Sequence, residues 1–296
     1  MKKPVIALKH RRGGGFRLYR KGFQTFNRLL KPHCDYCHGD FLSLFWYNGL
    51  LNGGIMKKFA FTLAEVLITL GIIGVVASLT LPTLIQKQQE KIWINQFKSS
   101  YSVLSQAYVR AYQEHGLINE WNLSTEDKKS SSMTIAEKLL PYLKLSKDFG
   151  QNDKNSSHGL PNTYLELDGR QSVNWNGWRE VEYIFALANG ATVGLQGIIE
   201  GRDSNNNSEK KGVFYLDING GKGPNQFGKD FFIMLFNTKN NYPVITGYNL
   251  WWLTEESCSR TKRQAWHSGG SCATWLIKTG NMDYLHRELT HEEWIQ

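Results

Sequence analysis

The amino-acid sequence predicts an α+β fold, in which a long N-terminal membrane-spanning helix packs on a small head built around an antiparallel β-sheet. Three observations predict this fold. An almost unbroken apolar run extends from Phe59 to Ile85. An aromatic stripe with the period of a helix face follows it over residues 93–112. Short apolar runs separated by Asn- and Gly-rich turns then occupy residues 182–246, which is the pattern of antiparallel strands.

The net charge of +9 is distributed unevenly along the 296 residues. Residues 1–55 contain ten Lys and Arg against two Asp, and Lys57 and Lys58 add two more positive charges, which leaves residues 59–296 with a net charge of −1. A strongly basic chain suggests a nucleic acid or an acidic lipid as partner. Because the charge lies almost wholly before residue 59, no nucleic-acid partner is indicated.

Residues 1–55 have the composition of a basic leader and not of a domain, since they are rich in Lys, Arg and Gly with one short apolar patch. His33-Cys34-Asp35-Tyr36-Cys37-His38 offers metal ligands, but zinc sites usually add a second pair further along, and none follows nearby. Met56-Lys57-Lys58 is a typical start for a short basic leader. We therefore expect translation to begin at Met56, with residues 1–55 a mis-annotated start.

Residues 61–85 have the length and composition of a transmembrane helix. Lys57 and Lys58 precede them, so the positive-inside rule places this end in the cytoplasm and the head outside it. A cleavable secretory signal would have a shorter apolar core followed by a small-x-small site. One carboxylate, Glu65, lies within the run, where a charge is costly and marks a functional site.

The segment from Lys57 to Glu65, with the sequence KKFAFTLAE, resembles the cleavage and methylation signature of type IV prepilins and type II secretion pseudopilins. The resemblance implies a leader peptide at 56–60, cleavage between Ala60 and Phe61, and N-methylation of the new Phe61 amine. Glu65 is then the fifth residue of the mature chain, as in that family. The sequence departs from the pattern at Ala60, where Gly is usual, and at Ala64, where a bulkier aliphatic residue is commoner.

The resemblance implies a single-pass subunit of the inner membrane with an extracytoplasmic head, which then enters a filament. Its partners would be other pilin or pseudopilin subunits and the prepilin peptidase and methyltransferase. Glu65 of one subunit would pair with the Phe61 amine of its neighbour during assembly, because an unpaired charge in a low-dielectric medium is costly. The alternative is a membrane-anchored extracytoplasmic module that stays uncleaved and binds carbohydrate or protein.

The helix is expected to cover residues 61–116 and to end at Gly116. After the span, apolar side chains recur every three or four residues and would hold the head: Trp93, Phe97, Tyr101, Leu104, Tyr108 and Tyr112. Pro82 cannot donate to the carbonyl of Ser78 and is expected to kink or loosen the helix. In pilins a proline at this place accompanies local melting of the helix in the filament.

Residues 117–296 are expected to form the globular α+β head. Asn189-Gly190 lies between two apolar runs and predicts a hairpin over 182–196, because Asn-Gly is the strongest local hairpin signal. A short helix is expected at 133–143. Further strands are expected at 213–218, 231–236 and 242–246, and loops at 117–132, 146–163 and 201–211.

The loop from Asp217 to Asp230 contains four glycines and one proline. Its Asp-x-Asn-Gly start resembles the opening of a calcium loop, in which oxygen ligands recur at every second residue. Asp217, Asn219 and Asp230 are the candidate calcium ligands, although no Glu stands where an EF-hand needs one. The alternative is a tight loop whose Asp and Asn side chains cap backbone amides. No other cofactor is expected.

Cys258 and Cys272 lie 14 residues apart near the C-terminus. Outside the cytoplasm they would form a disulfide, and the alternative is a pair of free buried thiols. A Cys-bounded region near the C-terminus also resembles that of many pilins. This part of the chain also contains four tryptophans: Trp251, Trp252, Trp266 and Trp275. They are either buried in a small core or exposed for glycan binding.

Catalytic motifs are absent from the sequence: it holds no G-x-S-x-G, no H-E-x-x-H, no P-loop and no dinucleotide-binding fingerprint. An assembly protein is therefore expected, and not an enzyme. The processing chemistry would belong to the peptidase, for which this chain is the substrate.

Overall fold

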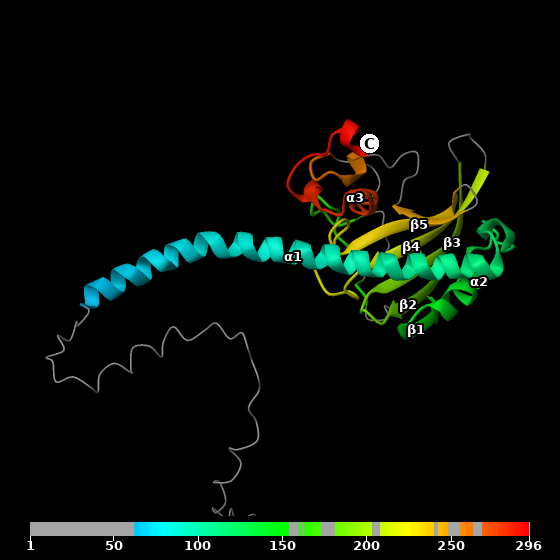
Figure 1. Ribbon diagram of the computed structural model, residues 1–296, viewed down its shortest axis with the longest axis horizontal. Coiled ribbons are helices and arrows are strands. Elements are labelled where there is room, and N and C mark those ends of the chain that lie inside the picture. Colours follow the sequence, from blue (N-terminus) through cyan, green and yellow to red (C-terminus); the bar gives the residue numbers. More distant parts are fainter. Residues whose placement is uncertain are drawn as a thin grey trace, which may run out of the picture. The chain divides into compact units, whose positions relative to one another are not determined.

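The computed structural model describes residues 62–153, 160–161, 163–172, 181–202, 208–239, 242–247, 255–262 and 268–295. The chain divides into two units, Met1–Leu63 and Ala64–Gln296, and the first of these is described only at its last two residues. The second unit contains nearly all of one long helix, a six-stranded antiparallel sheet and several short helices (Figure 1). This is the α+β class expected from the sequence.

Helix α1 (Leu63–His115) continues without interruption through Pro82, and Figure 1 shows its N-terminal part curving. The helix ends where expected, because Gly116 adopts a left-handed φ of 76° and its N–H donates to the carbonyl of Tyr112 at 2.9 Å. The aromatic stripe lies against the head, with Phe97 and Tyr108 each only 1% exposed. The expected core role of the stripe is confirmed.

The sheet consists of six strands that pair in the order of the chain, each antiparallel to the next. The strands are β1 (Leu145–Gln151), β2 (Tyr183–Leu187), β3 (Thr192–Arg202), β4 (Ser208–Asp217), β5 (Phe231–Lys239) and β6 (Tyr242–Gly247). Strands β2 and β3 form the expected hairpin, with Gly190 in its turn at a φ of 91°. Because every pairing is between sequence neighbours, short turns suffice to build most of the sheet.

The short helices are α2 (Lys128–Leu139), α3 (Cys272–Thr279), α4 (His291–Ile295) and the 3-10 turns Ile118–Glu120, Leu140–Tyr142, Glu255–Cys258 and Asp283–Leu285. The sheet buries both of its faces. Strand β4 alternates between them: Phe214 and Leu216 join α1, α2 and α3 in one core, whereas Val213 and Tyr215 join Tyr164 in a second core. We call these the helix-side core and the loop-side core.

Four elements differ from the sequence-based expectation. Helix α2 begins at Lys128 and not at 133, because the Asp127 side chain accepts a hydrogen bond from the Ser130 N–H at 2.9 Å and caps an earlier first turn. Strand β1 forms where a loop was expected, since pairing with β2 orders a segment that has no clear apolar alternation. Strands β3 and β4 also extend into the expected loop at 201–211.

Cys258 and Cys272 form a disulfide, with Cα atoms 4.9 Å apart and both residues buried. The alternative of two free thiols is therefore wrong. The bond joins the turn at Glu255–Cys258 to the first residue of α3. It lies in the helix-side core together with Trp275 and Leu276.

Candidate functional site

The first candidate site is the N-terminal part of α1, which is long and apolar enough to cross a membrane. None of its most apolar 18-residue stretch is buried within the protein. Leu63 and Leu79 expose 77% and 71% of their surface, and apolar side chains between and after them are exposed as well, up to Ile85. A continuous apolar surface of this extent indicates a lipid or protein cover, because soluble monomers rarely expose one.

The second part of α1 is fixed to the sheet. Beyond Trp93 its apolar face is buried, and two tyrosines add hydrogen bonds to strand backbones. The hydroxyl of Tyr101 donates to the carbonyl of Ile245 at 3.1 Å, and that of Tyr108 donates to the carbonyl of Asn237 at 2.9 Å. One helix therefore has an exposed apolar half and a half that holds the head.

Hydroxyl groups in the exposed half are satisfied within the helix. Four of them donate to backbone carbonyls three or four residues earlier at 2.8–3.0 Å, namely those of Thr69, Ser78, Thr80 and Thr83. Such bonds suit an apolar medium, in which an unsatisfied polar group is costly. They also bend helices slightly, and three of them surround Pro82, where a backbone donor is missing.

Glu65 lies exposed in the first turn of α1, where the helix dipole favours a negative charge. Ala60 and Phe61, the residues of the expected cleavage, lie outside the described residues. The pairing of Glu65 with a Phe61 amine, the methylation of Phe61, and the melting of the helix near Pro82 therefore stay predictions.

The second candidate site is the loop between β4 and β5. The structure brings the three candidate calcium ligands together. Asn219 connects the two carboxylates, because its backbone N–H donates to Asp217 Oδ1 and its side-chain amide donates to Asp230 Oδ2, each at 3.2 Å. Both Asp side chains are buried.

Hydrogen bonds already occupy the carboxylate oxygens of this loop. The hydroxyl of Tyr164 donates to Asp217 Oδ2 at 2.7 Å. The backbone N–H groups of Asn225 and Gln226 donate to Asp230 at 2.8 and 2.7 Å. These bonds give the Asp side chains the role of loop caps, as the tight-loop interpretation expects.

Two amide oxygens of the same loop keep open acceptor capacity. The Oδ1 atoms of Asn219 and Asn225 are buried and accept no hydrogen bond from the described part of the chain. Oxygen atoms of amides and carboxylates are the ligands that Ca²⁺ prefers. Among the residues that the structure describes, however, no group of three or more His, Cys, Asp and Glu gathers around one point. The side-chain oxygen atoms that this loop offers to Ca²⁺ therefore belong to two carboxylates, Asp217 and Asp230, and to two amides, Asn219 and Asn225.

Burial dominates the electrostatics of the loop. It raises the pKa of Asp230 to about 6, against the hydrogen bonds from Gln226 and Asn225, and the charge of Asp217 raises it further. Burial also raises the pKa of Asp217, against the hydrogen bond from Tyr164 and those from the loop backbone. A bound cation would favour both charged forms.

The loop is seated on neighbouring parts of the head. Gly220 has a φ of 71°, and a Cβ atom there would lie 2.7 Å from the carbonyl oxygen of Gly190 in the β2–β3 turn. At the other end, the carbonyl of Gly228 accepts a hydrogen bond of 2.8 Å from the Tyr284 hydroxyl. Sequence reasoning missed Tyr164 and Asn225 as loop partners. Tyr164 comes from a segment 53 residues before Asp217, and no spacing in the sequence signals that contact.

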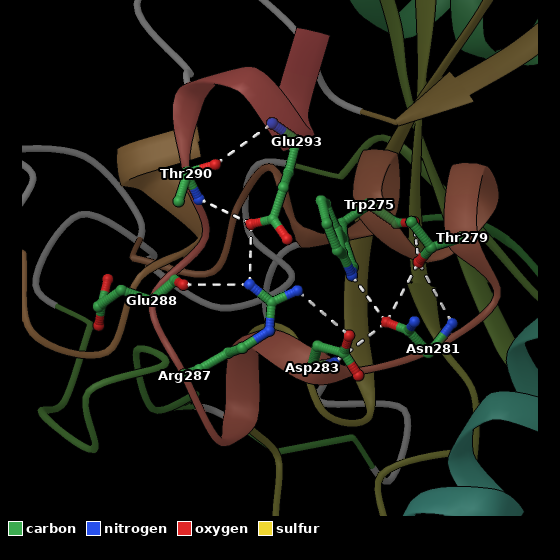
Figure 2. A network of polar contacts seen from close by, with 8 residues as sticks. All are labelled: Trp275, Thr279, Asn281, Asp283, Arg287, Glu288, Thr290 and Glu293. Atoms are coloured by element: carbon green, nitrogen blue, oxygen red, sulfur yellow. Dashed lines mark hydrogen bonds and ion pairs between the residues drawn. The ribbon is translucent and has the colours of Figure 1, made fainter. Parts of the chain in front are cut away.

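Of the four C-terminal tryptophans named in the sequence analysis, the structure describes Trp275. Trp275 is 4% exposed and its indole N–H donates to Asn281 at 2.9 Å, so it is a core residue. Figure 2 shows it beside a polar network centred on Arg287, which bonds Glu293 at 2.8 Å and reaches Asp283 at 3.4 Å. The other tryptophans named above, Trp251, Trp252 and Trp266, lie outside the described residues.

Comparison of the chain with known proteins finds no matching family model, no matching curated sequence and no matching solved structure.

Proposed function

We propose that this chain is a pilin-like subunit, a minor pilin or pseudopilin, which prepilin peptidase processes before it enters a type IV pilus or a type II secretion pseudopilus. The observation that carries the proposal is the division of α1. Its N-terminal half follows the KKFAFTLAE signature and exposes a continuous apolar surface, whereas its C-terminal half is fixed to the head. Subunits that pack through the exposed halves would form a helical core with the heads outside.

Charge pairing between neighbouring subunits would set the position of each subunit along such a filament relative to the next. Cleavage after Ala60 would create a positive amine at Phe61, four residues before Glu65. In a membrane or a packed helical core either charge alone is costly, so each favours the position where it meets the other. The inner membrane holds the subunit through residues 61–85 until assembly.

The test is the N-terminal sequence of the protein extracted from membranes of cells that carry prepilin peptidase. The expected product begins with N-methyl-Phe61, and a chain from cells without the peptidase still carries Lys57 and Lys58. A chain that keeps Lys57 in both strains contradicts processing. That outcome favours the second candidate, an uncleaved anchored module that binds carbohydrate or protein with its head.

Calcium binding to the β4–β5 loop is part of the proposal, supported by the open Oδ1 atoms of Asn219 and Asn225 beside two buried carboxylates. Calcium would be held by Asp217, Asn219 and Asp230 and would lock the loop. The experiment measures the thermal midpoint of the full chain with calcium or with a chelator. A calcium-dependent rise that Asn219→Ala abolishes supports the site. Equal midpoints favour the capped loop without metal.

A further inference from the structure

A pocket of about 430 Å³ lies where the exposed half of α1 meets the head. Helix α1 contributes side chains from Ile85 to Trp93. The head contributes Lys229, Arg260 and His286, which come from three separate segments of the chain. The proposed cleavage does not use this pocket, which shares only Lys229 with the β4–β5 loop.

Positive charge exceeds negative charge in the pocket. The one carboxylate that lines it, Glu90, lies 2.7 Å from His286 Nε2 and is engaged there. Arg260 donates to the carbonyl of Leu285 at 2.6 Å, which is a neutral acceptor. Within the described ranges, the Lys229 ammonium takes part in no hydrogen bond or ion pair. Lys229 and Arg260 therefore bring two positive charges to the pocket, and the negative charges of Asp230 and Glu90 act on Lys229.

Trp93 lines the pocket, whereas its indole N–H is buried and has no acceptor among the residues that the structure describes. The positively charged donors that line the pocket are therefore those of Lys229 and Arg260. Charged donors of this kind bind oxyanions.

The length of α1 beyond its apolar run sets the position of the pocket relative to the membrane. The apolar run ends at Ile85, and Gln86 to Glu90 cover about 7 Å of helix axis at 1.5 Å per residue. The polar headgroup layer on each side of a bilayer is about 5–7 Å thick. When residues 61–85 fill the hydrocarbon layer, the pocket lies at the level of the headgroups on the head side.

We propose that this pocket binds the phosphate group of an anionic phospholipid, with Lys229 and Arg260 as its charge partners. Ile85, which is 64% exposed, continues the apolar surface along which an acyl chain would lie. The proposal rests on insertion of α1 into a membrane, one part of the proposed function. It does not depend on cleavage or on assembly, so its failure leaves those steps intact.

The test uses the full chain in a neutral detergent, with native mass spectrometry as the readout of bound lipid. Dioleoyl phosphatidylglycerol is expected to bind more tightly than dioleoyl phosphatidylcholine, whose choline group is repelled by the pocket. Lys229→Gln is expected to weaken phosphatidylglycerol binding about fivefold, the effect of one basic residue at a membrane surface. Lys229→Arg should restore it. Lys129→Gln, at an exposed position in the first turn of α2, is the matched control and should leave binding unchanged.

Inorganic phosphate distinguishes the two sources of the same chemistry. If phosphatidylglycerol binds no better than phosphatidylcholine, or if Lys229→Gln leaves its binding unchanged, the proposal is overturned. It is also overturned if only inorganic phosphate binds in a Lys229-dependent way, since the site then takes a free anion and not a lipid. Equal thermal midpoints of the wild type and Lys229→Gln verify that the variant is folded.

Discussion

The hydroxyl group of Tyr108 donates a hydrogen bond of 2.9 Å to the backbone carbonyl of Asn237, across 129 residues of sequence. The same ring packs edge-on against Phe236, with ring centroids 5.4 Å apart. Helix α1 is thereby joined to β5 by both a polar and an aromatic contact. The head is held by the same helix whose other half is exposed and apolar.

Tyr108→Phe is expected to destabilise the head by about 1 kcal/mol, because it removes one buried hydrogen bond and keeps the ring. Chemical denaturation of the full chain in detergent, followed by near-UV circular dichroism, measures the change. Tyr242→Phe is the matched control, since Tyr242 is 71% exposed. Equal losses in the two variants would contradict the role of the Tyr108 bond.

Replacing Cys258 and Cys272 with Ser is expected to cost about 3 kcal/mol, the chain-entropy effect of a disulfide that closes a loop of this size. The thermal midpoint of the double variant should be lower than that of the wild type and indifferent to reductant. Reductant should lower the midpoint of the wild type only. A wild-type midpoint that stays constant after verified reduction would show that packing, and not the bond, holds this region.

Glu65→Gln is expected to insert into the membrane normally and to fail in assembly, because the amide keeps the shape of the side chain but cannot neutralise the Phe61 amine. Membrane fractionation measures insertion, and shearing of cells followed by quantification of the subunit measures the filament. Gln88→Glu, beyond the apolar run, is a control for a changed charge on α1. Normal filament yield from Glu65→Gln would count against the pairing.

Protonation of Glu293 in acid is expected to lower the stability of the head. Hydrogen bonds from Arg287 and Thr290 lower its pKa to about 2 from an ordinary value of 4.5. A lowered carboxyl pKa adds stability above pH 4.5, and this contribution is lost as the pH falls from 4.5 through 2. Thermal midpoints between pH 2 and 6 should therefore fall less steeply for Glu293→Gln than for the wild type. Parallel curves would contradict this contribution.

The main elements of the head could be predicted because their signals are local. The helical stripe from Trp93 to Tyr112 repeats over five turns, and Asn189-Gly190 fixes a hairpin by turn chemistry alone. The apolar runs that became β4, β5 and β6 were bounded by Gly and Asn. Only their lengths were underestimated, since strand ends depend on pairing with a neighbour.

Parts that depend on distant contacts could not be predicted. Strand β1 has exposed residues at 146–148 and no apolar alternation, so its pairing with β2 is its main source of order. The segment with Tyr164 covers the loop-side face of the sheet, although its sequence is that of a polar loop. The pocket joins α1 with Lys229, Arg260 and His286, and its lining residues lie up to 201 positions apart, from Ile85 to His286.

The sequence by itself determined the long helix, the apolar run with Glu65, the KKFAFTLAE signature and the cysteine pair, because each depends on residues that are near one another in the chain. The tertiary structure confirmed which half of α1 is exposed and that the cysteines meet, and it alone decided that Asp217 and Asp230 are capped by Tyr164, Asn225 and Gln226. Burial and hydrogen-bond saturation arise from packing, and neither can be read from the order of residues.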